Sequence, residues 1–169
     1  MNVAAILKLK GRGVVTARPD TSLLEIAQTL SQNDIGCIVI VGDDGKIAGI
    51  VSERDIVRVI SQAGAKGLKK PVESCMTKKV VAAREGDAID RLMAEMTTHR
   101  FRHMPVVEKG RLNGLVSIGD VVKMRISEVD MEATATREYT GYCLEEGHHP
   151  IGLPQSMPQY HGRSGRSAD

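Results

Sequence analysis

The chain has 169 residues, and 23 Lys and Arg against 21 Asp and Glu give it a formal net charge of +2. This near balance argues against a protein that neutralises many nucleic-acid phosphates. With one Phe, three Tyr and no Trp, the chain lacks the aromatic platforms on which single-stranded nucleic acid stacks. No apolar segment approaches the roughly 20 residues of a membrane span, and no signal peptide is evident. Cys37, Cys75 and Cys143 lie far apart, so we expect a cytoplasmic protein with reduced thiols.

The first half of the chain predicts one strand, a helix, two strands and a second helix, in that order. Residues 3–9 precede this pattern and resemble a short amphipathic helix. Apolar residues then predict a strand over 14–17, a helix over 22–32, a hairpin with strands over 35–41 and 47–51, and a helix over 55–60. Ser22 and Glu25 have the spacing of a capping box, which marks the start of the first of these two helices.

The same order of elements returns from Val80. We predict a strand over 80–83, a helix over 89–96, a hairpin with strands over 103–107 and 112–116, and a helix from Val121 onward. The halves align without a gap over residues 14–41 and 80–107. A repeat this small rarely buries enough surface to be stable alone. We therefore predict one α/β (α+β) domain in which two pseudo-symmetric βαββα repeats pack sheet against sheet.

The predicted organisation of the chain follows from this repeat. Repeat 1 covers 3–62, a linker covers 63–79, repeat 2 covers 80–126, and a C-terminal helix covers 127–146. The linker begins with a basic stretch that we expect to be flexible, and it ends with a short helical echo of the N-terminal segment. The tail over 147–169 is rich in Gly, Pro, His, Ser and Gln, a composition that favours disorder.

A Ser-x-x-Asp motif recurs at the same place in both repeats, in GIVSERDIV (49–57) and GLVSIGDVV (114–122). In each copy a buried strand runs into a helix, with Ser52 or Ser117 at the junction and Asp55 or Asp120 in the first helical turn. The motif predicts a helix cap. Its recurrence also suggests a contact with a ligand, and the two roles are compatible.

Three stretches, VSERDIVRVI, HRFRHMPVVEKGRLNGLVSIGDVVK and MTKKVV, resemble a tandem pair of CBS domains, the module named after cystathionine β-synthase and also called a Bateman module. The resemblance covers residues 3–126. It implies a regulatory module without enzymatic activity, which binds adenosine-containing ligands in clefts between the two repeats. It also implies a homodimer, for which the apolar stripes over 22–32 and 89–98 are candidate contacts, with 131–142 adding to them.

The resemblance assigns two ligand clefts, because the Ser and Asp of one repeat face the first two strands of the other. The first cleft would comprise Ser52, Asp55, Val81, Ala82, Arg102, His103, Met104 and Pro105. The second cleft would comprise Val15, Thr16, Gly36, Cys37, Ile38, Ser117 and Asp120. An ionised Asp only accepts hydrogen bonds, so it suits the hydroxyls of a ribose. A helix N-terminus suits an anion, and aliphatic walls suit an adenine.

The two predicted clefts differ in charge. Arg102 and His103 form a cation pair where the first repeat has uncharged residues, and this pair favours phosphate. Arg54 opens the helix after Ser52 and can reach the same phosphate, whereas the corresponding Gly119 cannot. Arg100 fits either a phosphate contact or a solvated positive edge. We therefore expect a charged nucleotide in the first cleft and a nucleoside, or no ligand, in the second.

Several alternatives stay open at this point. AMP, ADP, ATP, NAD(H) and S-adenosylmethionine all contain adenosine, and the sequence names neither the ligand nor the regulated partner. The main competing hypothesis is a protein-interaction or structural module with vestigial clefts. A weaker one is a nucleic-acid binder that uses Lys66, Lys69, Lys70, Lys78 and Lys79. We expect no metal, because Cys143, His148, His149 and His161 match no zinc spacing.

Overall fold

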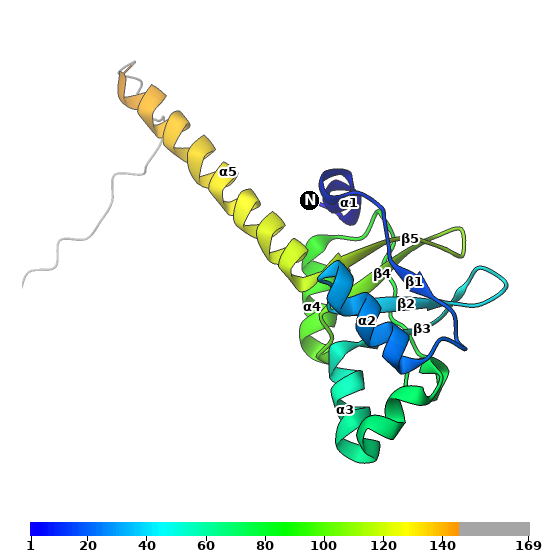
Figure 1. The fold of residues 1–169 in the computed structure, drawn as a ribbon. Coiled ribbons are helices and arrows are strands. Elements are labelled where there is room, and N and C mark those ends of the chain that lie inside the picture. Colours follow the sequence, from blue (N-terminus) through cyan, green and yellow to red (C-terminus); the bar gives the residue numbers. More distant parts are fainter. Residues whose placement is uncertain (146–169) are drawn as a thin grey trace, which may run out of the picture. The chain divides into compact units, whose positions relative to one another are not determined.

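The computed structural model describes residues 1–145, of which 1–130 form one compact unit (Figure 1). The first repeat contains α1 (Val3–Lys10), β1 (Thr16–Ala17), α2 (Leu23–Asn33), β2 (Cys37–Val41), β3 (Ile47–Ser52) and α3 (Glu53–Ala63). Two 3₁₀ helices follow, η1 (Gly64–Lys69) and η2 (Val72–Ser74). The second repeat contains α4 (Ile89–His99), β4 (His103–Glu108), β5 (Arg111–Ser117) and α5 (Ile118–Glu145). The predicted tail over 147–169 lies outside the described residues, and within them no helix is long and apolar enough to cross a membrane.

The first repeat forms a three-stranded sheet in the order β1-β2-β3. β1 runs parallel to β2, with Thr16 opposite Val39, and β2 runs antiparallel to β3, with Cys37 opposite Ser52. The capping box predicted at the start of α2 is present, because Ser22 Oγ accepts from the Glu25 N–H at 3.3 Å and the Glu25 carboxylate accepts from the Ser22 N–H at 3.0 Å. The predicted α/β fold class is confirmed.

The second repeat has a two-stranded sheet, β4-β5, and the strand predicted over 80–83 is wrong. Only Ala83 pairs with β4: its N–H donates to Pro105 O at 2.9 Å, and the N–H of Val107 donates to its carbonyl at 2.8 Å. In a parallel ladder, the next bond toward Val81 would need the N–H of Pro105, which proline lacks. The first repeat has Val39 at the position of Pro105, and there the strand β1 forms.

Each of the two cores is completed by the segment that precedes the other repeat in the chain. Val3 and Leu7 of α1 are at most 1% exposed and belong to the core of the second repeat. Val72 of η2 is fully buried in the core of the first repeat. The segment 63–79, expected to begin as a flexible linker, therefore contains a buried anchor and two 3₁₀ helices.

Matching glycines allow this close packing in both repeats. A Cβ on Gly114 of β5 would lie 2.7 Å from Leu7, and a Cβ on Gly49 of β3 would lie 2.6 Å from Met76. Distances this short are essentially absent from real structures, so a side chain at either position would force Leu7 or Met76 to move. The second core thus depends on α1, which lies before the first sheet in the chain, whereas the first core draws only on residues 15–76.

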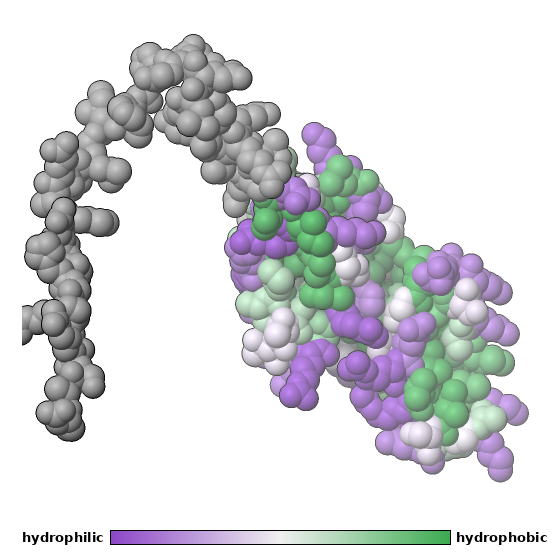
Figure 2. All heavy atoms as spheres, turned by 90° about the vertical axis from the view of Figure 1, so that its left-hand side faces the viewer, coloured by the Kyte–Doolittle hydropathy of each residue, from purple (hydrophilic) through white to green (hydrophobic). Residues whose placement is uncertain are grey.

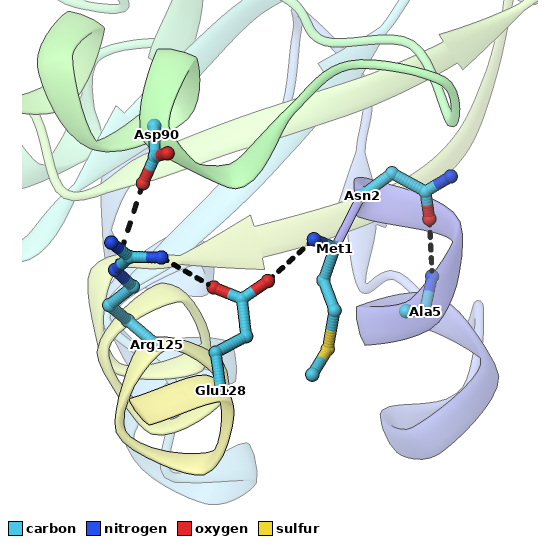
Figure 3. Close-up of polar contacts among 6 residues, drawn as sticks. All are labelled: Met1, Asn2, Ala5, Asp90, Arg125 and Glu128. Carbon is cyan, nitrogen blue, oxygen red and sulfur yellow. Dashed lines mark hydrogen bonds and ion pairs between the residues drawn. The ribbon is translucent and has the colours of Figure 1, made fainter. Parts of the chain in front are cut away.

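The start of α1 is also tied to α5 by polar contacts, which Figure 3 shows. The amino group of Met1 lies 2.5 Å from Glu128 Oε1, and Arg125 donates to the other carboxylate oxygen of Glu128 at 2.9 Å. Arg125 also lies 3.9 Å from Asp90 of α4. These contacts and the buried face of α1 together fix α1 against the second repeat.

The core-facing residues of the two apolar stripes lie in the chain's own cores and are not free for a dimer contact. Leu24 of the first stripe is 46% exposed, and the homodimer itself stays a prediction. Leu23, Ile26 and Leu30 of α2 are 0–3% exposed, and the corresponding residues of α4, Ile89, Leu92 and Met96, are 1–2% exposed. The helical period that marks these stripes also fits a face packed on its own sheet. Of the segment 131–142, the side chains from residue 132 onward lie outside the described part.

Candidate ligand cleft

A cleft of about 330 Å³ lies between the two repeats, and residues of both line it. This volume falls within the range of small-molecule sites. Three segments form most of the lining: the end of β3 with the first turns of α3, the stretch that leads into the second repeat, and the loop between α4 and β4. The lining residues are Gly36, Cys37, Ile50, Val51, Ser52, Glu53, Arg54, Asp55, Arg58, Thr77, Lys79, Val80, Val81, His99, Arg100, Phe101, Arg102 and His103.

Five of the eight residues predicted for the first cleft line it in the structure, and so does Arg54. These five are Ser52, Asp55, Val81, Arg102 and His103. Met104 is 2% exposed and belongs to the core of the second repeat, and the neighbouring Pro105 is buried too. Ala82 is exposed but does not line the cleft. Met104 and Pro105 therefore do not line the cleft.

Asp55 acts as the cap that the motif predicts. One carboxylate oxygen, Oδ2, accepts from the Ser52 N–H at 2.9 Å and from Ser52 Oγ at 2.7 Å. The other oxygen, Oδ1, accepts from Arg58 Nη1 at 3.3 Å. Arg58 is 59% exposed and belongs to the same helix, so it can swing aside for a ligand. The geometry is compatible with both roles that the sequence left open.

The cleft is rich in positive charge. Arg54, Arg58, Lys79, Arg100 and Arg102 line it, against the two carboxylates of Glu53 and Asp55. Sequence reasoning missed Arg58, and it named Lys79 only as a candidate nucleic-acid contact. Arg58 is detectable in principle, because it lies one helical turn beyond Arg54 and Asp55 and so shares their face. For Lys79, the sequence indicates a place in the cleft only through its position directly before the predicted strand at Val80.

His103 lines the cleft beside Arg102, and its pKa is shifted away from the cationic form that we expected. Burial lowers its pKa below the ordinary value of 6.5, and the positive charges of Arg102 and Lys10 lower it further, against the opposing effect of Asp120 and Glu53. At pH 7 its imidazole is therefore neutral. The ring reaches across to the first repeat, where a Cβ on Gly36 would lie 3.3 Å from His103 Cε1.

Asp120, in the second predicted cleft, has a different set of partners. Its Oδ2 accepts from the Ser117 N–H and from Ser117 Oγ, both at 2.8 Å, and from Lys10 Nζ at 2.6 Å. Burial works to raise the pKa of Asp120, but the hydrogen bonds from Lys10 and Ser117 outweigh it and hold the pKa below its usual value. Sequence reasoning missed Lys10, which lies 110 residues away along the chain, and no local signal links the two residues.

The other residues predicted for the second cleft are divided between several places. Gly36 and Cys37 line the first cleft. Burial raises the pKa of the Cys37 thiol to about 12, so it forms a neutral part of the wall. Ile38 is fully buried in the core of the first repeat, and Val15 packs against the same core. Thr16 is exposed on β1.

Comparison with known proteins finds a matching family model and similar solved structures. A family model for the CBS domain matches residues 9–62 and 72–127. The fold is similar to that of the CBS-domain containing protein ATU1752 from Agrobacterium tumefaciens, with 47% identity and a TM-score of 0.72 over 74% of this chain and 99% of that one. The chain spans 66%, 65% and 51% of the length of three curated relatives that it matches.

Two similar structures contain ligands. The CBS domain pair of protein MJ0100, in complex with 5-methylthioadenosine and S-adenosyl-L-methionine, has 27% identity and a TM-score of 0.67 over 76% of this chain and 98% of that one. Protein PAE2072 from Pyrobaculum aerophilum, complexed with AMP, has 28% identity and a TM-score of 0.64 over 71% of this chain and 89% of that one. All three ligands contain adenosine or its 5′-thio analogue.

Proposed function

The chain belongs to the CBS-domain family, and we propose that it is a regulatory module that binds a phosphorylated adenosine ligand in the first cleft. AMP, ADP, ATP and NAD(H) all belong to this ligand class. The complexes of PAE2072 and MJ0100 support the adenosine part, and the excess of cations in the cleft supports the phosphates. S-adenosylmethionine carries a positive sulfonium and no phosphate, so it suits this cleft less well.

The placement of charge in the cleft is the observation that carries the proposal. Asp55 comes from the first repeat and only accepts hydrogen bonds, which suits the two hydroxyls of a ribose. Arg100 and Arg102 come from the second repeat and suit phosphate oxygens. A ligand that has both hydroxyls and phosphates would therefore bridge the two repeats. Binding of this kind favours one packing of the two repeats, and a partner protein can recognise that packing.

The first test is Asp55→Ala, with ADP binding measured by calorimetry. We expect a loss of about 1.5–3 kcal/mol, or roughly 10- to 150-fold in affinity, because a hydrogen bond to a charged group is removed. The substitution also removes a helix cap, so Glu25→Ala is the matched control: it removes the capping-box carboxylate of α2, outside the cleft. Glu25→Ala should lower the melting temperature and leave ADP affinity unchanged.

The result that contradicts the proposal is equally specific. If Asp55→Ala remains folded and binds ADP as the wild type does, Asp55 is a helix cap and nothing more. If the wild type also gains no thermal stability from any of the four nucleotides, the interaction-module hypothesis replaces the sensor hypothesis. A ligand present at about 100 times its Kd would raise stability by about 2.7 kcal/mol, which a melting experiment detects easily.

A second observation concerns the predicted homodimer. Large apolar side chains are exposed on α3, where Val57 is 65% and Ile60 43% exposed, and on α5, where Val122 is 43% and Ile126 57% exposed. Figure 2 shows apolar patches among charged side chains on one face of the unit. We propose that these two helices, in place of the buried stripes of α2 and α4, form the contact of a homodimer.

Light scattering of the wild type and of Val57→Glu at micromolar concentration tests this contact. We expect a dimer for the wild type and a monomer for the variant, because a charge in an apolar contact is unfavourable. Lys66→Glu, on the exposed surface of η1, is the control for a change of charge alone. A monomeric wild type would contradict the homodimer without affecting the ligand proposal.

A further inference from the structure

At the predicted second cleft, the capping carboxylate of Asp120 binds a cation of the chain itself, Lys10. We propose that Lys10 fills the ribose position of this cleft, so that each chain binds one nucleotide and not two. The inference rests on the proposed function for the class of ligand, and it concerns the number of sites and the residue that sets it.

The hydrogen bonds around Asp120 place Lys10 where a ligand hydroxyl would bind. Lys10 Nζ donates to Asp120 Oδ2 at 2.6 Å, and the same oxygen accepts from the N–H and the Oγ of Ser117. In the first cleft, the corresponding Asp55 Oδ2 accepts from Ser52, while the nearby cation, Arg58, is 3.3 Å from the other oxygen. The lysine contact is therefore shorter than the arginine contact, and it adds a third donor to the capping oxygen.

The surroundings of Lys10 include residues that were predicted for the second cleft. The charge of Lys10 acts on Cys37 of β2 and on His103 of β4 as well as on Asp120. Cys37 and Asp120 were both assigned to this cleft, and they come from different repeats. The ammonium group thus lies near side chains of both repeats, on the carboxylate that we expected to bind a ribose.

The backbone on both sides of Lys10 is fixed. Before it, Val3 and Leu7 are buried in the second core, and the N–H of Val3 donates to Asp87 O at 3.0 Å. After it, Arg12 forms an ion pair with Glu85. Lys10 therefore ends a helix that is held in place, and its side chain is 35% exposed. Because this backbone is already ordered, little further conformational entropy is lost when Lys10 binds Asp120.

A ribose hydroxyl competes poorly with this lysine. The hydroxyl is a neutral donor, whereas the ammonium is charged, and charge-assisted hydrogen bonds to a carboxylate are roughly twice as strong as neutral ones. A nucleotide that entered the second cleft would have to displace Lys10 from Asp120. The ion pair between Lys10 and Asp120 would then be lost.

The test is a calorimetric titration of the full chain with ADP. We expect one site per chain for the wild type and two for Lys10→Met. The second site becomes measurable because removal of a competing charge-assisted bond raises its affinity by about tenfold or more. Lys8→Met, which removes an exposed lysine from the same helix, is the matched control and should keep one site. The double variant Lys10→Met/Asp120→Asn should return to one site and so locate the second site at Asp120.

Each result has a definite meaning. Two sites in the wild type, or one site in a folded Lys10→Met, overturn the inference and leave the proposed function intact. Binding only after Lys10→Met supports the inference and contradicts the proposed function of the first cleft. No binding by either protein contradicts both. Circular dichroism checks the fold of each variant, and Lys10→Gln, which is closer to lysine in shape, replaces Lys10→Met if that variant unfolds.

Discussion

The starts of α3 and α5 have the same motif and opposite surroundings. At α3, the cap carboxylate of Asp55 faces a cleft lined by five cationic side chains. One of them, Arg58 of the same helix, donates to Asp55 Oδ1 at 3.3 Å. At α5, the cap carboxylate of Asp120 is held by Lys10, which comes from the N-terminal helix. The capping bonds from Ser52 and Ser117 match to within 0.1 Å.

This difference shows that a repeated motif determines its local structure but does not determine what its carboxylate binds. Ser-x-x-Asp determines the cap in both repeats, because all of its atoms lie within one helical turn. What the carboxylate can bind depends on residues that other segments bring to it. For Asp55 these segments come from the second repeat, and for Asp120 the decisive one is the end of α1.

The largest effect we predict concerns the two segments that close the cores. Leu7 packs over Gly114 and is 1% exposed, whereas Met76 packs over Gly49 and is only half-buried. Leu7→Ala should reduce the free energy of unfolding by about 2–5 kcal/mol, because it leaves a cavity in the second core. Met76→Ala should reduce it by less. Urea unfolding at 25 °C measures both values.

Equal losses in the free energy of unfolding for Leu7→Ala and Met76→Ala would contradict the predicted difference between the two cores. The control is Leu9→Ala, since Leu9 lies on the same helix as Leu7 and is 79% exposed. We expect a change of less than about 0.5 kcal/mol for this variant, as is usual at exposed positions.

A smaller effect is predicted for the pH dependence of binding in the first cleft. His103 is neutral at pH 7 because its pKa is lowered, and a phosphate beside it would favour the protonated form. ADP binding should then take up a proton, so affinity should rise as pH falls from 7.5 toward 6, by at most about tenfold per pH unit. Adenosine, which has no phosphate, should show no such rise.

His103→Gln is the control, because it removes the titrating group. It should abolish the pH dependence of ADP affinity, and an unchanged slope would show that another group takes up the proton. In the absence of ligand, the lowered pKa also has a consequence for stability. The unfolded chain binds more protons below about pH 6.5, so the wild type should lose stability as pH falls through this region, and His103→Gln should lose less.

The smallest effect we predict concerns stability at the second cleft. The pKa of Asp120 is held below 3.8, so its stabilising contribution is present above that value and is lost as pH falls through the lower pKa of the folded state. Asp120→Asn should cost up to about 1 kcal/mol at pH 7, since the ion pair is partly exposed. The difference from the wild type should shrink below about pH 4. Urea titrations at pH 7 and pH 3 measure it, and an equal cost at both would assign the effect to the cap alone.

Much of the fold follows from the sequence because the repeat is regular. The hairpins, the capping box of Ser22 and both Ser-x-x-Asp junctions depend on residues within a few positions of one another. The missing strand before Ala83 was also predictable in principle. Pro105 replaces Val39 in the alignment of the repeats, and a proline in a strand removes a hydrogen-bond donor.

The rest of the fold depends on contacts between distant residues, which local patterns do not encode. The apolar face of α1 fits either core equally well by its period, and nothing in residues 3–10 says that it packs in the second. Likewise, no spacing rule connects Lys10 with Asp120, or places Arg58 and Arg102 around one cleft. The reduced charge of His103 arises from burial, which its neighbours in the sequence do not reveal.

The position of α1 also has a consequence for the order in which the chain is made. Leu7 leaves the ribosome early, but Val116, which shares its core, is synthesised roughly 100 residues later, or about 5–20 seconds at ordinary rates. During that interval the apolar face of α1 has no partner of its own, and the first repeat still lacks Val72 until the segment 63–79 emerges. The second core thus cannot form until the second repeat has been synthesised, and the apolar face of α1 stays without its packing partner until then.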